Sequence, residues 1–205
     1  MLHLIPGLLT SPSSGWSPIR DYADRHPWGF VPFLALLPLL PALCAYFGAT
    51  NVGWDLFGSA QERRLSSASA ASLALMLYLT YVTSVLVMGL AVRWVLYRTP
   101  QRPAYSVATT FTAVLAAPLA LAGIVTVFPL RWLLLPALAL GALCTVLLLY
   151  RGLPAYLHLK RNDQERFYAT CILAAGILVV LTLAFFFMEL WWQPLDGGGY
   201  VAPVE

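Results

Sequence analysis

Length, composition and charge place this chain outside the range of soluble globular proteins. Of its 205 residues, 60% are hydrophobic and only 10% are charged, whereas soluble domains carry roughly 25% charged residues. A helix needs about 20 apolar residues to cross a hydrocarbon core ~30 Å thick, and the chain contains several such runs. The composition therefore predicts one all-α bundle of transmembrane helices, with no length left for a second, soluble domain.

Residues 1–27 are expected to form an N-terminal amphipathic segment at the membrane interface. Apolar residues recur at helical spacing there, for example at Trp16, Ile19 and Tyr22. A short amphipathic helix with Trp on its apolar side tends to lie in the headgroup plane. Packing of the same face beneath the bundle is an alternative that the pattern leaves open.

Five apolar runs follow, and we expect each of them to form one transmembrane helix. Together they define a five-span domain over residues 28–191, and the glycine-rich residues 192–205 are expected to be a flexible periplasmic tail. The five predicted spans cover residues 28–47, 70–90, 107–127, 132–150 and 168–188.

Prolines and small residues predict how some of these spans are shaped and packed. Pro32, Pro38 and Pro41 remove backbone donors from the first span and should kink it. The connection at residues 128–131 is short enough to make the third and fourth spans an antiparallel hairpin. Small residues let helix backbones approach closely, so we expect Gly141 of the fourth span to face the third.

Polar side chains gather on the second predicted span. Thr80 and Ser84 stand four residues apart on one helical face, and Tyr78 and Tyr81 lie close to them in the sequence. Hydroxyls inside a bilayer turn toward a neighbouring helix, where each hydrogen bond contributes about 0.6 kcal/mol. The same four residues could instead form an intramembrane polar strip that binds a ligand.

The basic residues predict the orientation of the chain in the membrane. With five spans, the N-terminal segment, the second loop and the fourth loop share one side, and they hold two, three and four of the 12 Lys and Arg residues. The positive-inside rule then places the N-terminus in the cytoplasm and the C-terminus in the periplasm. The densest basic cluster lies in and beside the fourth loop: Arg151, Lys160, Arg161 and Arg166.

Several stretches of the sequence look familiar as a set: residues 9–12 followed by Trp16, residues 44–54, residues 100–103, residues 128–132 and the run Leu149-Tyr150-Arg151-Gly152-Leu153-Pro154. In these stretches the chain resembles the Yip-domain family of membrane proteins, and in particular its small bacterial branch of YohC-type inner-membrane proteins. The resemblance covers nearly the whole chain, and its segments occur in the expected order.

This resemblance implies a five-span protein of the bacterial inner membrane with a cytoplasmic N-terminus. Eukaryotic members of the family are linked to vesicle transport and to Rab-type GTPases, but a bacterial inner membrane has no such vesicles, so that partner is not carried over. The family implies no enzymatic activity and supplies no catalytic positions to transfer.

Sequence motifs of catalysis and metal binding are absent from the chain. The three cysteines and three histidines are dispersed, which leaves neither a disulfide framework nor metal-ligand spacing. The sequence contains no Walker A, HExxH or GxSxG pattern. We therefore expect no enzymatic activity, no metal, no cofactor and no nucleic-acid partner.

Two functional hypotheses remain, with an intramembrane enzyme a distant third. The first is a membrane protein that organises lipid or recruits partners through its basic cytoplasmic loops, with anionic headgroups, an unidentified protein or a second copy as partner. The alternative is a small transporter or lipid-moving protein. The residues expected to face lipid or a partner are Trp16, Arg151, Gly152, Pro154, Lys160, Arg161 and Arg166.

Overall fold

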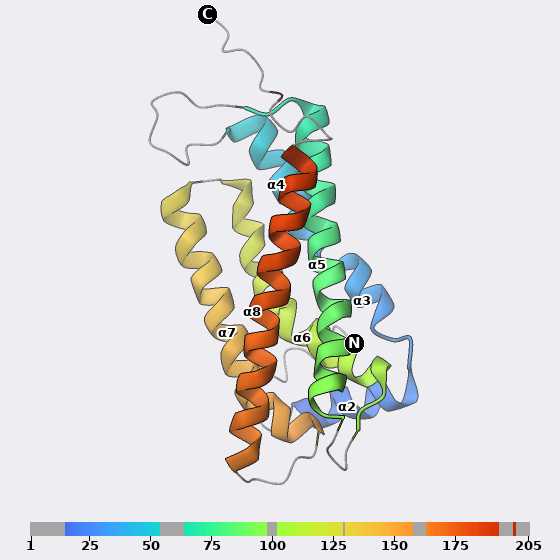
Figure 1. The fold of residues 1–205 in the computed structure, drawn as a ribbon. Coiled ribbons are helices and arrows are strands. Elements are labelled where there is room, and N and C mark those ends of the chain that lie inside the picture. Colours follow the sequence, from blue (N-terminus) through green and yellow to red (C-terminus); the bar gives the residue numbers. More distant parts are fainter. Residues whose placement is uncertain are drawn as a thin grey trace, which may run out of the picture.

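The computed structural model describes residues 15–53, 64–97, 102–128, 130–157 and 163–192, together with Gly199. These parts of the chain are helical and contain no β-strand (Figure 1). The helices are α2 (Trp16–Arg25), α3 (Val31–Leu36), α4 (Leu39–Phe47), α5 (Ser67–Val95), α6 (Tyr105–Ala122), α7 (Arg131–Leu157) and α8 (Asp163–Trp192). A π-helical turn, η2 (Gly48–Val52), continues α4, and a 3₁₀ turn, η3 (Gly123–Val127), continues α6.

Five helical stretches of the described chain are long and apolar enough to cross a membrane, which confirms the predicted five-helix class. Inside a bilayer the backbone must satisfy its own hydrogen bonds, so such apolar runs become helices. The five stretches are Val31–Val52, Ser67–Val95, Tyr105–Val127, Trp132–Tyr156 and Arg166–Trp192.

Helix α2 lies across one end of the bundle, beside the ends of α6 and α7 (Figure 1). Its apolar residues Trp16, Ile19 and Ala23 are buried against the bundle. The helix therefore packs beneath the spans, the second of the two interpretations of residues 1–27. Its position in the headgroup plane stays a prediction, and residues 1–14 and most of residues 192–205 lie outside the described chain.

The first span is two short helices rather than one kinked helix. Helix α3 ends at Leu36, and α4 begins only at Leu39. Pro38 has no backbone N–H and lies at the break, so the interruption falls where a helical hydrogen bond would be missing. The span then extends through the π-helical turn to Val52, five residues beyond its predicted end at residue 47.

Helix α7 continues through Gly152 and Pro154 to Leu157, past its predicted end at residue 150. Glycine and proline often mark a helix end, but here the residues around them are packed against other helices. Leu153 and Tyr156 are fully buried, and this burial offsets the weaker helix propensity of the two residues.

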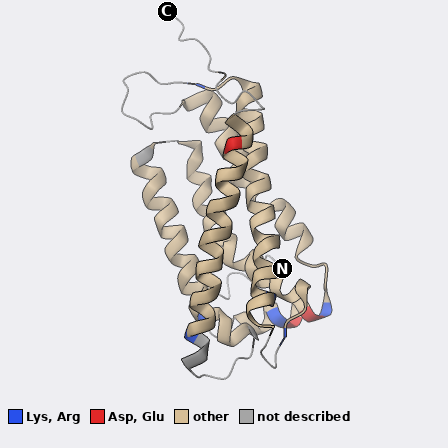
Figure 2. Ribbon diagram, in the orientation of Figure 1, with Lys and Arg blue, Asp and Glu red and all other residues tan. Residues whose placement is uncertain are grey.

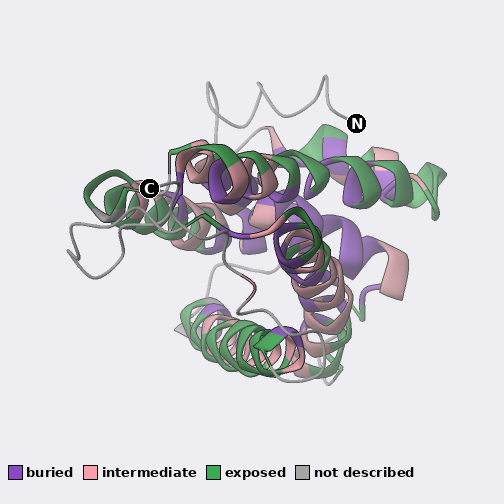
Figure 3. Ribbon diagram, turned by 90° about the horizontal axis from the view of Figure 1, so that it is seen from above, coloured by how far each residue is buried: buried purple, intermediate pink, exposed green. Residues whose placement is uncertain are grey.

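Helix α6 forms the centre of the bundle because it contacts α5, α7, α4 and α2. From Val107 to Leu115 every residue is buried, and Figure 3 shows the buried residues gathered where the helices face one another. Thr112 donates a hydrogen bond to the Val85 carbonyl of α5 at 3.1 Å. Gly141 of α7 faces α6, where an added Cβ would lie 3.1 Å from the Pro118 carbonyl oxygen, as its spacing predicted.

Trp191 joins α8 to α5 at the end of the bundle opposite α2. Its indole Nε1 donates to the Ser69 carbonyl at 3.0 Å and to the Ser72 hydroxyl at 3.1 Å. The side chain is buried with Leu73 and Met76. These contacts hold the last turn of α8 in place.

We expect Trp191→Phe to lower the free energy of unfolding by about 1 kcal/mol, because both acceptors lose the indole donor. In a chain of this size, that loss corresponds to a fall in Tm of roughly 2–4 °C. Thermal unfolding in detergent measures the effect. Trp192→Phe is the matched control, since Trp192 is mostly exposed; an equal fall in both variants would contradict this assignment.

Candidate functional site

Most arginines of the described chain lie at the end of the bundle where α2 lies, which we call the basic end (Figure 2). They come from α2, from the last turn of α5, from the residues before α6, and from α7 and α8: Arg20, Arg25, Arg93, Arg102, Arg151 and Arg166. At the opposite end, Arg64 precedes Leu65, which packs with Trp191 of α8, Glu189 lies in the last turn of α8, and Arg131 begins α7. Positive charge is therefore concentrated at one end of the bundle.

Three aromatic rings hold α2 on the bundle at the basic end. The Trp16 ring lies 5.1 Å from Phe111 of α6 and 5.7 Å from Tyr156 of α7, measured between ring centroids. Phe111 and Tyr156 stack on each other at 5.1 Å, and the Tyr156 hydroxyl donates to the Val107 carbonyl at 3.0 Å. Each such aromatic pair contributes about 0.5–1.5 kcal/mol beyond the burial of its area.

Gly152 provides the space that the Trp16 ring occupies. A Cβ added at Gly152 would lie 2.5 Å from Trp16 Cζ2 and 2.8 Å from Nε1, which is closer than non-bonded atoms approach. A glycine is therefore required on this face of α7 while α2 is docked. The Trp16 Nε1 is buried and has no hydrogen-bond partner within the described chain.

Arg20 adds a polar contact at the edge of this aromatic cluster. Its guanidinium carbon lies 5.6 Å from the centre of the Tyr156 ring, and Nη1 donates to the Tyr156 carbonyl at 3.4 Å. Its Nε forms an ion pair with Asp24 at 2.9 Å. Arg20 is thus engaged inside the protein, in contrast to the exposed arginines of α7 and α8.

The structure separates the residues that were expected to face lipid or a partner. Arg151 and Arg166 are exposed at the basic end. Trp16 and Gly152 are buried against each other, so the expectation that they face lipid or a partner is wrong. Their burial follows from the docking of α2, and Pro154, two residues after Gly152, is half-buried. Lys160 and Arg161 lie outside the described residues.

Helices α7 and α8 meet beside the two exposed arginines. The Tyr150 hydroxyl and the Thr170 hydroxyl are 3.0 Å apart and share a hydrogen bond. Arg151 follows Tyr150 directly, and Arg166 lies one turn before Thr170. This bridge therefore places both arginines at the same junction of the two helices.

The predicted polar strip on α5 does not form one site. Tyr78 donates to the Ala35 carbonyl of α3 at 3.3 Å, and Thr80 donates to the Met76 carbonyl of its own helix at 2.7 Å. The Tyr81 hydroxyl is buried and has no hydrogen-bond partner among the described residues, and Tyr81 does not line the cavity described next. Only Ser84 lines that cavity. Side chains on one helix have different partners because successive turns of the helix pack against different neighbours.

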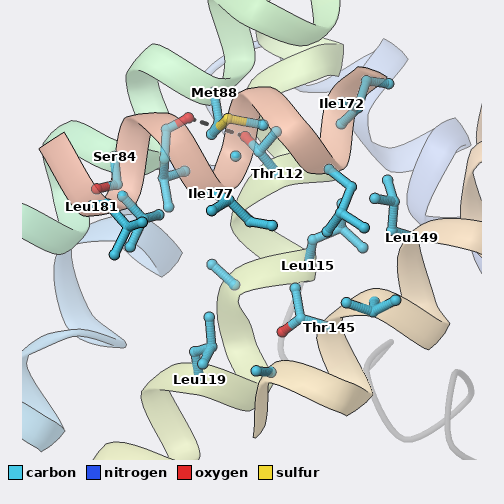
Figure 4. Close-up of a pocket in the computed structure, with 17 residues that line it drawn as sticks. Ser84, Met88, Thr112, Leu115, Leu119, Thr145, Leu149, Ile172, Ile177 and Leu181 are labelled. Carbon is cyan, nitrogen blue, oxygen red and sulfur yellow. Dashed lines mark hydrogen bonds between the residues drawn. The ribbon is translucent and has the colours of Figure 1, made fainter. Parts of the chain in front are cut away.

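A cavity of about 360 Å³ lies between α5, α6, α7 and α8 (Figure 4). Its walls are apolar apart from three hydroxyls. Thr112 and Thr145 donate to backbone carbonyls, whereas the Ser84 hydroxyl is buried and unpartnered within the described chain. A cavity of this size falls in the range of roughly 300–1,000 Å³ that is usual for ligand pockets.

The cavity is open between α7 and α8. Ile172 and Leu149 line the end of the cavity next to the Tyr150–Thr170 hydrogen bond, and they are 1% and 3% exposed. Ile177 and Leu181, which also line it, are 55% and 64% exposed, so they stand at an open rim on α8. Ala142 is the exposed lining residue on α7. The cavity therefore opens to the outside of the bundle, between α7 and α8.

Sequence reasoning missed this cavity and the contact of Arg20 with Tyr156. The residues that line the cavity are ordinary apolar residues, and no spacing in the sequence shows that α7 and α8 diverge. For Arg20, the Asp24 partner four residues later was a readable signal, but the distant Tyr156 was not. Within the described residues, no group of three or more His, Cys, Asp or Glu side chains is placed to hold a metal.

Five apolar helices, a docked amphipathic helix and a segregated basic end define a polytopic membrane protein. The family model for the Yip1 domain matches residues 7–184, and the chain belongs to this family. It is 30% identical over 185 residues to the inner membrane protein YohC of Escherichia coli K12, covering 90% of this chain and 94% of the relative. The YohC protein of the Escherichia coli O6:H1 strain matches to the same extent. No solved structure matches the chain.

We expect Gly152→Ala to displace α2, because the new methyl group overlaps the Trp16 ring and overpacking costs about 1–3 kcal/mol. Hydrogen exchange of the α2 amides should accelerate relative to the native protein. Gly176→Ala is the matched control, since its Cβ would meet Met88 Cε at an ordinary 3.4 Å. Unchanged α2 protection in Gly152→Ala would show that Trp16 does not hold the helix.

Proposed function

We propose that this protein is a non-enzymatic component of the bacterial inner membrane that organises lipid by binding anionic headgroups at its basic end. The observation that carries the proposal is that Arg151 and Arg166 are both exposed next to the junction of α7 and α8, where Tyr150 and Thr170 share a hydrogen bond. The inner-membrane location is taken from the YohC relatives, whose name describes them as inner membrane proteins.

Charge and exposure support a headgroup site there. Basic residues next to a membrane surface bind anionic lipid with about 1 kcal/mol each. Arg20 is engaged by Asp24 and Tyr156, so the exposed arginines of α7 and α8 are the more available ones. Lys160 and Arg161 belong to the connection between these helices, and we propose that they add to the same basic surface.

The docked α2 supports the same proposal because it packs across the basic end and turns charged residues outward there. Its apolar face is covered by the bundle, while Asp21 and Arg25 are exposed. A surface of this kind can also recruit a protein partner or a second copy of the chain. We favour membrane binding because Arg166 begins one span and Arg151 lies near the end of another, where basic side chains are expected to meet headgroups.

A lipid-moving role is the second candidate, and the open apolar cavity is the observation that favours it. A carrier of polar solutes needs charged or polar groups along its path. The described cavity has only three hydroxyls, and two of these are bonded to the backbone. The cavity therefore supports contact with lipid tails rather than passage of a water-soluble substrate.

We expect the double substitution Arg151→Gln and Arg166→Gln to weaken binding of phosphatidylglycerol by roughly 30-fold, the equivalent of about 2 kcal/mol. Binding of phosphatidylcholine should change little. Lipid retained by purified protein from mixed vesicles, counted by mass spectrometry, measures both. Arg64→Gln at the opposite end is the control, and an equal loss of phosphatidylglycerol in that variant would argue against a specific headgroup site.

The proposed orientation places the N-terminus and the basic end in the cytoplasm. Fusions after Glu205 should then show alkaline phosphatase activity and no green fluorescence, because the phosphatase requires the oxidising periplasm to form its disulfides. Fusions after Arg102, in the second loop, serve as the opposite control and should fluoresce. A fluorescent fusion at Glu205 would reverse the proposed orientation.

A further inference from the structure

We propose that the cavity between α7 and α8 holds one acyl chain of a phospholipid from the leaflet at the basic end. This inference rests on the proposed function in one respect, because it gives the bound lipid a tail site as well as a headgroup site. The protein would then bind an individual lipid molecule through its headgroup and its acyl chain.

The chemistry of the walls selects hydrocarbon. Apart from three hydroxyls the lining is aliphatic, from residues such as Val85, Leu115 and Ile172. Apolar cavities of about 150 Å³ stay dry and take up apolar molecules such as benzene, and this cavity is more than twice as large. Left empty, its lining would lose dispersion contacts that a chain supplies.

The position of the opening indicates that the hydrocarbon comes from the bilayer. Ala142 of α7 and Ile177 and Leu181 of α8 are lining residues that are also exposed. They lie within two membrane spans, so what stands outside the opening is the interior of the bilayer. A lipid tail can enter sideways, without its headgroup leaving the interface.

The length and position of the cavity match one leaflet. Its liners on α8 run from Ile172 to Leu181, which at 1.5 Å per residue is about 14 Å. One leaflet contributes half of a hydrocarbon core ~30 Å thick. The end of the cavity at Ile172 lies close to Arg166, and the end at Leu181 lies farther from the basic end. A phospholipid whose phosphate is bound at Arg151 and Arg166 would therefore have its acyl chain at the depth of the cavity.

The divergence of α7 and α8 explains why protein atoms do not fill this space. Helix α7 packs mainly on α6, and α8 packs mainly on α5. The two helices meet at the Tyr150–Thr170 bridge and separate toward the opposite end (Figure 1). Leu149 and Ile172 are buried where they line the cavity next to that bridge, and farther along α8 the exposed lining residues Ile177 and Leu181 mark its opening.

The test uses the full-length protein in vesicles that contain a phospholipid with a photoactivatable diazirine at mid-chain. Light expels nitrogen, and the resulting carbene inserts into a nearby O–H bond. Ser84 is the reporter inside the cavity, since its hydroxyl is buried and unpartnered. Thr182, exposed on the outer face of α8, reports on the surrounding lipid. The measured quantity is the ratio of lipid adducts at Ser84 to those at Thr182, by peptide mass spectrometry.

Filling the cavity should remove the Ser84 adduct. Gly176 lines the cavity, and a Cβ there meets Met88 only at 3.4 Å, so Gly176→Leu extends a side chain into the space. We expect the adduct ratio to fall about tenfold, equivalent to a loss of roughly 1.4 kcal/mol in affinity. Ala174→Leu, exposed on the same helix and outside the cavity, should leave the ratio unchanged.

A second pair of variants fills the cavity from α7. Ala142→Leu should also lower the ratio, and Ala139→Leu, an exposed residue outside the lining, should not. This pair serves if Gly176→Leu fails to fold. Absence of an adduct at Ser84 while Thr182 is labelled, or equal ratios in the filled and control variants, would overturn the tail site.

The choice of probe separates this inference from the proposed function. The experiment is run with phosphatidylcholine and with phosphatidylglycerol carrying the same tail. Equal labelling of Ser84 by both, lost in the filled variants, supports the tail site and contradicts the anionic headgroup preference. Preferential labelling by phosphatidylglycerol that filling does not change supports the headgroup preference and overturns the tail site.

Discussion

The contacts that helix α6 makes with its neighbours determine how α2, α5 and α7 are placed in the bundle. Phe111 of α6 receives Trp16 and Tyr156, Thr112 reaches the backbone of α5, and Gly141 brings α7 close to the turn that holds Pro118. Helix α8 packs on α5 instead. Because two neighbouring spans lean on different partners, a wedge of space remains between them, and the cavity occupies it.

The structure also gives a physical reason for residues that carry the family resemblance. Trp16 and the run from Leu149 to Pro154 are separated by more than half of the chain, yet Trp16 fits against Gly152. Leu153 beside this contact is fully buried. These residues hold α2 on the bundle, so their first role is architectural, whereas Arg151 within the same run is exposed.

In a bilayer, a closely packed basic end and a cavity that opens between α7 and α8 can both be stable. In water, an apolar opening between helices would collapse or aggregate, since burial of apolar surface is strongly favoured. In lipid there is no such force between helices, because the tails are as apolar as leucine. A span such as α8 can therefore keep most of its surface exposed while hydrogen bonds and close contacts hold its two ends.

The sequence by itself determined the class of this protein. Apolar runs of membrane length must become helices because no other partner exists for the backbone in lipid, and small-residue spacing correctly turned Gly141 toward α6. The tertiary structure alone decided that Trp16 and Gly152 are buried, that Tyr78, Thr80, Tyr81 and Ser84 separate, and that a cavity opens beside Ile177. An amphipathic pattern states that a face is apolar but not what covers it, because the covering residues come from distant parts of the chain.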